Sequence, residues 1–467
     1  MNKPNKAKGG RPVLIVTTIG SFLMPVALSA VNVALPSIGK DLAMDAISLS
    51  WIALAFTLSA GMFLVPFGKL ADTWGQTKIF IAGNWVFTVA SFFLTISPSP
   101  WMLIAFRAMQ GLGAAMLFGT VLAILVAAYP LEERGKVLGI NVASVYLGLS
   151  FGPFIGGVLT QNIGWRSVFF LNVPLGLANT LLSMWKLPRD PDHGELKGGR
   201  FDLLGSFIYC AMLFSLLYGF SLLPDTLAMV FVAGGVVGIG VFVWWEGRVG
   251  QPVLDINLFM RNRGFTLSNM AALINYAATF AVAFLLSFYL QHIKGLSPQN
   301  AGLVLVCQPA VQAILSPVAG RLSDRVEPRI LASLGMGTTA LCLFILASFG
   351  TTTSLTAVVL TLGLLGVGFA FFSSPNMNAI MSSVEDKFHG VASSMVATVR
   401  LLGQMFSMGI AMLTFAIFMG QMEISPPLYP SLLKAIKTAF TIFALLCIVG
   451  AFTSSVRGNL RPGIRQD

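Results

Sequence analysis

Charge is what this 467-residue chain has least of, because only 10% of its residues are Asp, Glu, Lys or Arg. A typical soluble domain carries about 25%. Hydrophobic residues make up 56% of the chain, and the mean hydropathy is +0.82. These values exclude an ordinary soluble globule, and we expect the chain to lie in a lipid bilayer.

Cysteine and histidine are also scarce, with four and three residues. The cysteines lie in apolar runs without CxxC spacing, which is typical of buried thiols. The histidines fall in expected loops and have no metal-site spacing (His193, His292 and His389). The chain also lacks the Gly-x-x-x-x-Gly-Lys-Ser/Thr phosphate loop of an ATP-driven pump. We therefore expect no metal, no cofactor and no covalent chemistry, and hence no enzyme.

Long apolar segments, by contrast, follow one another along the whole chain. A membrane helix needs about 18 or more apolar residues, and short polar loops separate such segments. About fourteen are expected, at roughly 12–36, 47–67, 79–98, 101–129, 137–161, 167–185, 203–223, 227–246, 264–290, 300–319, 330–350, 353–382, 391–419 and 438–456. The first is about twice as long as a signal-peptide core, so we expect it to be retained.

The cations are unevenly distributed between the loops of this map. If the N-terminus is cytoplasmic, 22 of the 29 Lys and Arg residues lie on the cytoplasmic side and five on the other side. The remaining two, Arg107 and Arg400, lie within spans. Cytoplasmic loops of membrane proteins collect Lys and Arg. We therefore expect both termini in the cytoplasm, and the net charge of +11 needs no nucleic-acid partner.

A short charged motif occurs twice. Gly68-Lys69-Leu70-Ala71-Asp72 returns 252 positions later as Gly320-Arg321-Leu322-Ser323-Asp324, and four glycines recur at a spacing of 255. Such long-range recurrence indicates an internal duplication. The expected fold is an all-α polytopic membrane protein, with two six-helix bundles related by pseudo-symmetry and two extra central helices.

This duplication divides the chain into parts that can be listed by residue number. The expected parts are a cytoplasmic tail (1–11), the first bundle (12–185), a cytoplasmic loop (186–202), the two extra helices (203–247), an amphipathic linker (248–263), the second bundle (264–456) and a second tail (457–467).

Three motifs carry a resemblance to a known family. They are Gly68 to Lys78 between the second and third spans, Arg107-x-x-Gln110-Gly111-x-Gly113 in the fourth, and Gly148 with Gly152-Pro153-Phe154-Ile155-Gly156-Gly157 in the fifth. In this order, and over nearly the whole chain, they resemble the major facilitator superfamily and within it the 14-spanning drug:proton antiporters. Thr73 and Gln76 depart from the usual basic residues of the first motif.

The first motif and its second copy are expected to act as gates (Gly68, Asp72, Gly75, Gly320 and Asp324). Glycines permit a tight turn and close backbone contact, and the Asp carboxylate can accept hydrogen bonds from helix-start amides or pair with a cation. The alternative interpretation is a plain solvated turn.

The resemblance implies that residues of the other two motifs couple transport to proton movement (Arg107, Gly148, Gly152, Pro153, Gly156 and Gly157). Gly148, Gly152 and Gly156 share one helix face, which also fits generic glycine packing. Arg107 lies inside its span, where a cation costs about 2.5–3.5 kcal/mol on insertion scales. The alternative to a coupling role is that the long side chain of Arg107 reaches the bilayer surface.

Arg400 is the second cation inside a span. It is close in sequence to Gln404, and Asn376 lies on the span before. We expect Arg400 to contact substrate or an internal hydrogen-bond network. The remaining residues that could line a substrate cavity are Trp51, Phe56, Asn275, Tyr276, Gln308 and Gln312. For each of them, packing in the core is an equally open alternative.

No acid is evident at mid-membrane depth, since all 18 fall in loops, tails or helix ends. The resembled antiporters commonly place an Asp where this chain has Ala27, and a buried carboxylate is the usual proton carrier and counter-charge for cationic drugs. Its absence favours neutral or anionic substrates.

The expected function is secondary transport: a monomer in the cell membrane that exports small amphipathic compounds against proton entry. The alternatives are a transporter of an organic anion or metabolite that uses Arg400 as counter-charge, and a receptor that has lost transport.

Overall fold

The structure is a computed structural model that describes residues 7–188, 202–223, 225–250, 262–323, 325–384 and 389–457. Most of the expected loop 186–202 and linker 248–263 lies outside the described residues, and so does Asp324. The described residues form helices and no extended strand, and fourteen helical segments are long and apolar enough to cross a membrane. The predicted fold class is confirmed.

The helices follow the apolar runs of the sequence. Within a bilayer a helix satisfies its own backbone groups, so each run forms one. Asp45 shows how a span begins, because its side chain accepts hydrogen bonds from the amides of Ile47 and Ser48 at 2.9 and 3.0 Å. The helices are α1 (Ala7–Leu42), α2 (Ala46–Trp74), α3 (Gln76–Thr95), α4 (Pro100–Ala128), α5 (Leu131–Asn162), α6 (Arg166–Phe170), α7 (Asn172–Lys186), α8 (Leu203–Leu222), α9 (Thr226–Glu246), α11 (Arg263–Thr279), α12 (Val282–Phe288), the π-helix η1 (Tyr289–Ile293), α13 (Pro298–Ser323), α14 (Pro328–Ser348), α15 (Leu355–Ser382), α16 (His389–Met419), the short 3₁₀ helix η3 (Pro426–Leu428) and α17 (Tyr429–Val456).

Two expected boundaries differ most from the structure. The motif at 68–78 is not a loop, because α2 continues to Trp74 and α3 begins at Gln76. Gly75 alone makes the turn with φ 108°, a conformation that L side chains rarely adopt. The last span begins at Tyr429 instead of 438, because Pro430 is tolerated in a first helical turn.

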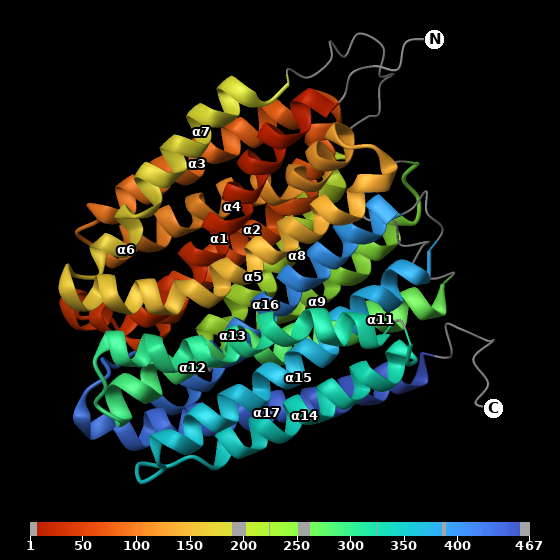
Figure 1. Ribbon diagram of the computed structural model, residues 1–467. Coiled ribbons are helices and arrows are strands. Elements are labelled where there is room, and N and C mark those ends of the chain that lie inside the picture. The colour runs from red at the N-terminus through yellow and green to blue at the C-terminus, as the bar shows by residue number, and fades with distance from the viewer. Residues whose placement is uncertain are drawn as a thin grey trace, which may run out of the picture.

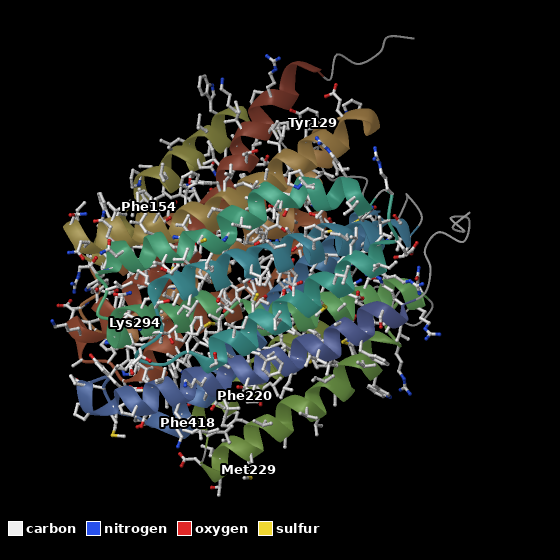
Figure 2. The ribbon with its side chains drawn as sticks, turned by 60° about the horizontal axis from the view of Figure 1, so that its bottom comes forward. Tyr129, Phe154, Phe220, Met229, Lys294 and Phe418 are labelled. Atoms are coloured by element: carbon white, nitrogen blue, oxygen red, sulfur yellow. The ribbon has the colours of Figure 1, made fainter. Side chains whose placement is uncertain are left out.

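α1 begins and α17 ends at the same end of the molecule (Figure 1). The first turn of α1 and the last turn of α17 lie there, as an even number of spans requires. We call this the terminal end. Tyr129, just after α4, lies at the terminal end, and Lys294 lies at the opposite end (Figure 2).

Helices that are near in sequence pack into two groups. α1 packs on α5, α2 and α3 pack on α4, and α7 packs on α3. In the second half of the chain, α11 packs on α16 and α17, α13 packs on α15, and α14 packs on α15 and α17. The pairs α5–α13 and α2–α16 join the two groups.

The duplication is visible in the packing itself. A Cβ added at Gly111 would collide with the carbonyl oxygen of Phe56, and one added at Gly366 would lie 2.5 Å from the carbonyl oxygen of Gln308. Gly366 follows Gly111 by 255 positions, and Gln308 follows Phe56 by 252. The same close helix approach therefore occurs at matched positions in both halves.

The two extra helices lie against this pair of bundles. Tyr209 of α8 donates to the carbonyl oxygen of Gly61 in α2 at 3.2 Å, and Phe220 of α8 packs where a Cβ on Gly409 of α16 would lie. α8 therefore contacts both halves. α9 packs on α8 and is otherwise largely exposed, as Met229 shows at the outer edge in Figure 2.

Candidate functional site

The two halves are in close contact at the end opposite the termini. A Cβ on Gly157 of α5 would lie 2.6 Å from the carbonyl oxygen of Pro298 in α13. A Cβ on Gly302 of α13 would overlap the carbonyl oxygen of Pro153 in α5. Because these neighbours are backbone atoms, only glycine fits at both positions.

The same end is closed between the first spans of the two halves. The Gln291 side chain, in η1, donates to the carbonyl oxygen of Val33 in α1 at 2.9 Å. Nearly every residue from 21 to 36 and from 281 to 290 is buried. On α5, residues are exposed both towards the terminal end (139, 140, 142 and 143) and towards the closed end (151, 154, 161 and 162). The interface is therefore closed at the end opposite the termini.

The fifth-span motif contacts both sides of this interface. Its small face packs on α1: a Cβ on Gly148 would lie 2.6 Å from the carbonyl oxygen of Phe22, and Cβ atoms on Gly152 and Gly156 would collide with Ser29 and Ala30. Pro153 and Gly157 face α13 instead. The motif thus places α5 between α1 and the other half, and its role in coupling stays a prediction.

Arg107 is completely buried, so the alternative that it reaches the bilayer surface was wrong. Its Nε donates to the carbonyl oxygen of Ile52 at 2.9 Å and its Nη1 to Oε1 of Gln110 at 2.6 Å. The guanidinium lies 4.5 Å from the Phe56 ring centre, and Gln110 donates onward to Ser91 at 2.8 Å. Arg107 thus ties α4 to α2 and α3, and Phe56 belongs to this network.

Arg400 lies where five helices from both halves meet. Its guanidinium is 5.7 Å from the ring centre of Phe118 in α4, and its charge acts on Tyr146 in α5 and Tyr276 in α11. Ser373 in α15 lies next to the Tyr146 hydroxyl. All five side chains are only partly buried. We call this group the central cluster.

The central cluster combines one cation with three aromatic rings in the middle of the spans. Aromatic faces bind planar apolar groups and cations, and a guanidinium pairs with carboxylates. Phe118, Tyr146 and Ser373 were missed by sequence reasoning. The sequence signal was Tyr146, which lies inside an apolar run, because the hydroxyl of a buried tyrosine usually has a hydrogen-bond partner.

Other cavity candidates lie near this region or form pairs of their own. Gln308 donates to Gln312 at 3.0 Å along α13, and Gln404 is buried one turn after Arg400 on α16. Asn275 is buried next to Tyr276, and its amide nitrogen has no hydrogen-bond partner among the described residues. Their contact with substrate stays a prediction.

Two candidates are engaged elsewhere. Trp51 lies 6.1 Å from the Tyr218 ring of the extra helix α8. Asn376 accepts a hydrogen bond from Arg457 at 2.8 Å and donates to the carbonyl oxygen of Ser268 at 3.1 Å, near the terminal end. Through these contacts, neither Trp51 nor Asn376 reaches the central cluster.

The gate motif has a matched contact in each half. A Cβ on Gly68 would lie 3.8 Å from the carbonyl oxygen of Gly119, and a Cβ on Gly320 would lie 3.8 Å from Cβ of Ser374. Gly320 follows Gly68 by 252 positions, and Ser374 follows Gly119 by 255. Asp72 accepts a hydrogen bond from Gln76 at 2.7 Å across the turn. An added Cβ would therefore make only ordinary contacts at both glycines. Gating stays a prediction.

His292 is a further residue that sequence reasoning set aside as a loop histidine. It lies in η1 beside the closed end, where a π-helical turn often marks a functional position. Its ring stacks on Phe288 at 5.9 Å and lies 5.8 Å from Tyr429. Nε2 is buried without a hydrogen-bond partner among the described residues. No sequence motif marks this position.

Two duplicated helical bundles that meet at one end, with polar and charged residues held between them, define a secondary transporter. The Major Facilitator Superfamily model matches residues 17–253 and 269–462. The chain belongs to this superfamily, and it is a transporter rather than an enzyme.

Relatives in the superfamily differ in what they carry. The chain is 31% identical to riboflavin transporter RibZ of Clostridioides difficile over 402 residues, covering 85% of this chain and 86% of that protein. It is 31% identical to multidrug resistance protein Stp of Mycobacterium tuberculosis over 408 residues (86% and 74%). It is 28% identical to the tetracenomycin C resistance and export protein of Streptomyces glaucescens over 409 residues (86% and 75%).

Solved structures confirm the fold. A bacterial homologue of the human lysosomal transporter Spinster, in an inward-facing and unoccupied conformation, aligns with a TM-score of 0.67 at 16% identity over 98% of each chain. Nucleoside transporter NupG aligns with a TM-score of 0.65 at 13% identity, over 96% of this chain and 99% of that one.

Proposed function

We propose that this transporter exports small amphipathic compounds, in exchange for protons, from a cell whose cytoplasm holds both termini. The observation that carries the proposal is the central cluster, in which both halves contribute partly exposed aromatic and cationic side chains at mid-span. The 22 cations on one side of the sequence map support the orientation.

In this orientation the closed end is external, and the molecule would be closed to the outside. The contacts of Gly157 with Pro298, and of Gly302 with Pro153, then form the external gate. Alternating access would open this gate by rocking one bundle against the other around the central cluster. Gly68, Asp72 and Gly320 would close the cytoplasmic side.

The charge of the central cluster favours neutral or anionic aromatic substrates. Arg400 supplies a positive charge, and the acids of the sequence lie in loops, tails and helix ends. An organic cation would have to approach Arg400 without a carboxylate to offset the repulsion. Drug-resistance relatives support the export of amphipathic compounds.

A second candidate is the transport of an organic anion or metabolite with Arg400 as counter-charge. The placement of Arg400 beside Tyr146 and Tyr276 favours it, because a guanidinium pairs with a carboxylate while the rings contact an aromatic body. A relative described as a riboflavin transporter supports a metabolite as cargo.

Proton coupling requires a group that changes protonation or hydrogen bonding during the cycle. The resemblance assigns coupling to Arg107 and the fifth-span motif, and the Arg107–Gln110–Ser91 network supports that role by joining three helices. His292 is a titratable group at the external gate. The groups around it are Lys294 on its own segment and Tyr429 on α17, where Lys437 lies further along near Tyr289.

Proteoliposome transport of matched aromatic compounds tests the substrate proposal. Wild type, Arg400→Lys and Arg400→Ala would be assayed with anionic, neutral and cationic members of one series. We expect Arg400→Ala to lose anion transport by about tenfold or more, the effect of about 1.4 kcal/mol, and Arg400→Lys to keep part of it. Unchanged transport of every class by Arg400→Ala would refute a substrate role for this residue.

A further inference from the structure

A groove on the outer surface of the second half has features of a lipid site. It has a volume of about 560 Å³ and is lined by seven residues of α14, from Arg329 to Leu341, together with Ser455 of α17. We call it the α14 groove. Since a helix rises about 1.5 Å per residue, the groove is about 18 Å long, slightly more than half of a hydrocarbon core about 30 Å thick.

The inner part of the α14 groove is apolar and open. A Cβ on Gly337 would have no atom within 4 Å, so the missing side chain leaves space on the helix surface. Leu334 and Leu341 flank this position and are 62% and 55% exposed. In a bilayer such a surface contacts an acyl chain.

The outer part of the α14 groove is positively charged. Arg329 is the second residue of α14, so its guanidinium lies near the membrane boundary at the terminal end. Ser333 and Ser455 also line the groove, where their hydroxyls donate to the carbonyl oxygens of Ala451 and Phe452. A cation above an apolar furrow matches a phosphate headgroup above its acyl chain.

A second arginine increases the positive potential at this corner. Arg457 follows α17 and is 4% exposed, and its Nη1 donates to Ser268 and Asn376. Burial is the main cause that lowers its pKa to about 10; the Glu327 carboxylate opposes this shift and the Arg329 charge adds to it. Nε and Nη2 of Arg457 have no hydrogen-bond partner among the described residues. An anion beside Arg329 would offset this repulsion between cations.

We propose that the α14 groove binds an anionic phospholipid, with its phosphate against Arg329 and one acyl chain along Leu334, Gly337 and Leu341. The lipid comes from the leaflet at the terminal end. Bound there, its headgroup stabilises the corner where α14, α17, α11 and α15 meet. The site is separate from the central cluster and does not depend on which substrate is carried.

Two variants remove the two parts of the site. Arg329→Gln removes the charge, and Gly337→Leu places a side chain in the furrow, at a position where an added Cβ has no atom within 4 Å. The matched control variants lie on or just after α9, one of the two extra helices. Arg248→Gln removes a cation at the terminal end of α9. Gly240→Leu adds a side chain at another glycine where an added Cβ has no atom within 4 Å.

Native mass spectrometry of the purified full-length transporter, titrated with phosphatidylglycerol or phosphatidylcholine, measures the binding. We expect preferential retention of one phosphatidylglycerol, about fivefold weaker in Arg329→Gln, in line with the effect of one cation near an anionic surface. Gly337→Leu should weaken both lipids, and both controls should bind as wild type. Equal binding of the two lipids by wild type, or unchanged phosphatidylglycerol binding in both groove variants, would overturn the proposal. Because the readout is lipid binding, a failure of the transport proposal leaves this result unaffected.

Discussion

Replacing Gly157 with alanine should weaken the closed end of the α5–α13 interface. The new Cβ would lie 2.6 Å from the carbonyl oxygen of Pro298 and 3.0 Å from Cα of Gln299, both backbone atoms that cannot rotate away. To lengthen the 2.6 Å contact to an ordinary 3.4 Å, the helices must separate by about 0.8 Å. Overpacking of this kind costs about 1–3 kcal/mol.

This cost applies only while the two helices are in contact. A conformation in which that end is open avoids it, so the ratio of open to closed molecules should rise by about 5- to 150-fold. Gly139→Ala on the same helix is the matched control, because its Cβ would have no atom within 4 Å. Both changes gain about 1 kcal/mol of helix propensity, so they differ in the contact alone.

Double electron–electron resonance can measure the opening. Spin labels at Ile163 and Met422, which are 72% and 52% exposed near the closed end, report the distance between the two halves. The four native cysteines would first be replaced by alanine. We expect a longer-distance population in Gly157→Ala and none in Gly139→Ala. Identical distance distributions in the two variants would show that this contact does not control closure.

Three further substitutions test other parts of the structure. Arg107→Gln should reduce transport by about tenfold or more because the bond to Ile52 is lost, yet thermal unfolding should change little because a costly buried charge is removed; full transport would contradict this. His292→Gln should leave facilitated flux intact but make accumulation insensitive to a pH gradient, measured in proteoliposomes; retained sensitivity would exclude His292 as the proton site. Gly75→Ala should lower the free energy of unfolding by about 1–2 kcal/mol because its φ of 108° is strained for alanine, and denaturant unfolding that matched wild type would refute this.

Much of the fold could be predicted because a helix that crosses a bilayer needs a long run of apolar residues, which can be found in the sequence. Each run of about 18 apolar residues became a span, and the recurrence of Gly68 as Gly320 indicated the duplication that the packing repeats. The boundaries were less predictable. Hydropathy indicates which residues suit lipid, not where the helix ends, so α2 continues through the polar residues before Gly75.

The candidate site could be predicted only in part. Arg107 and Arg400 stood out because cations inside spans are costly. Their partners did not, because a helix that is apolar all round has no polar face to show which side contacts other helices. Tyr146 and Phe118 therefore went unnoticed. The pairing of Arg457 with Asn376, 81 residues apart, depends on tertiary packing alone.

Uptake by inside-out membrane vesicles tests the central proposal of proton-driven export most directly. An acidic vesicle interior would be imposed, and accumulation of the best aromatic substrate would be followed before and after an ionophore collapses the pH gradient. We expect accumulation that requires the gradient, needs no ATP and is lost in Arg400→Ala. Accumulation that persists without the gradient, or that requires ATP, would contradict the proposal.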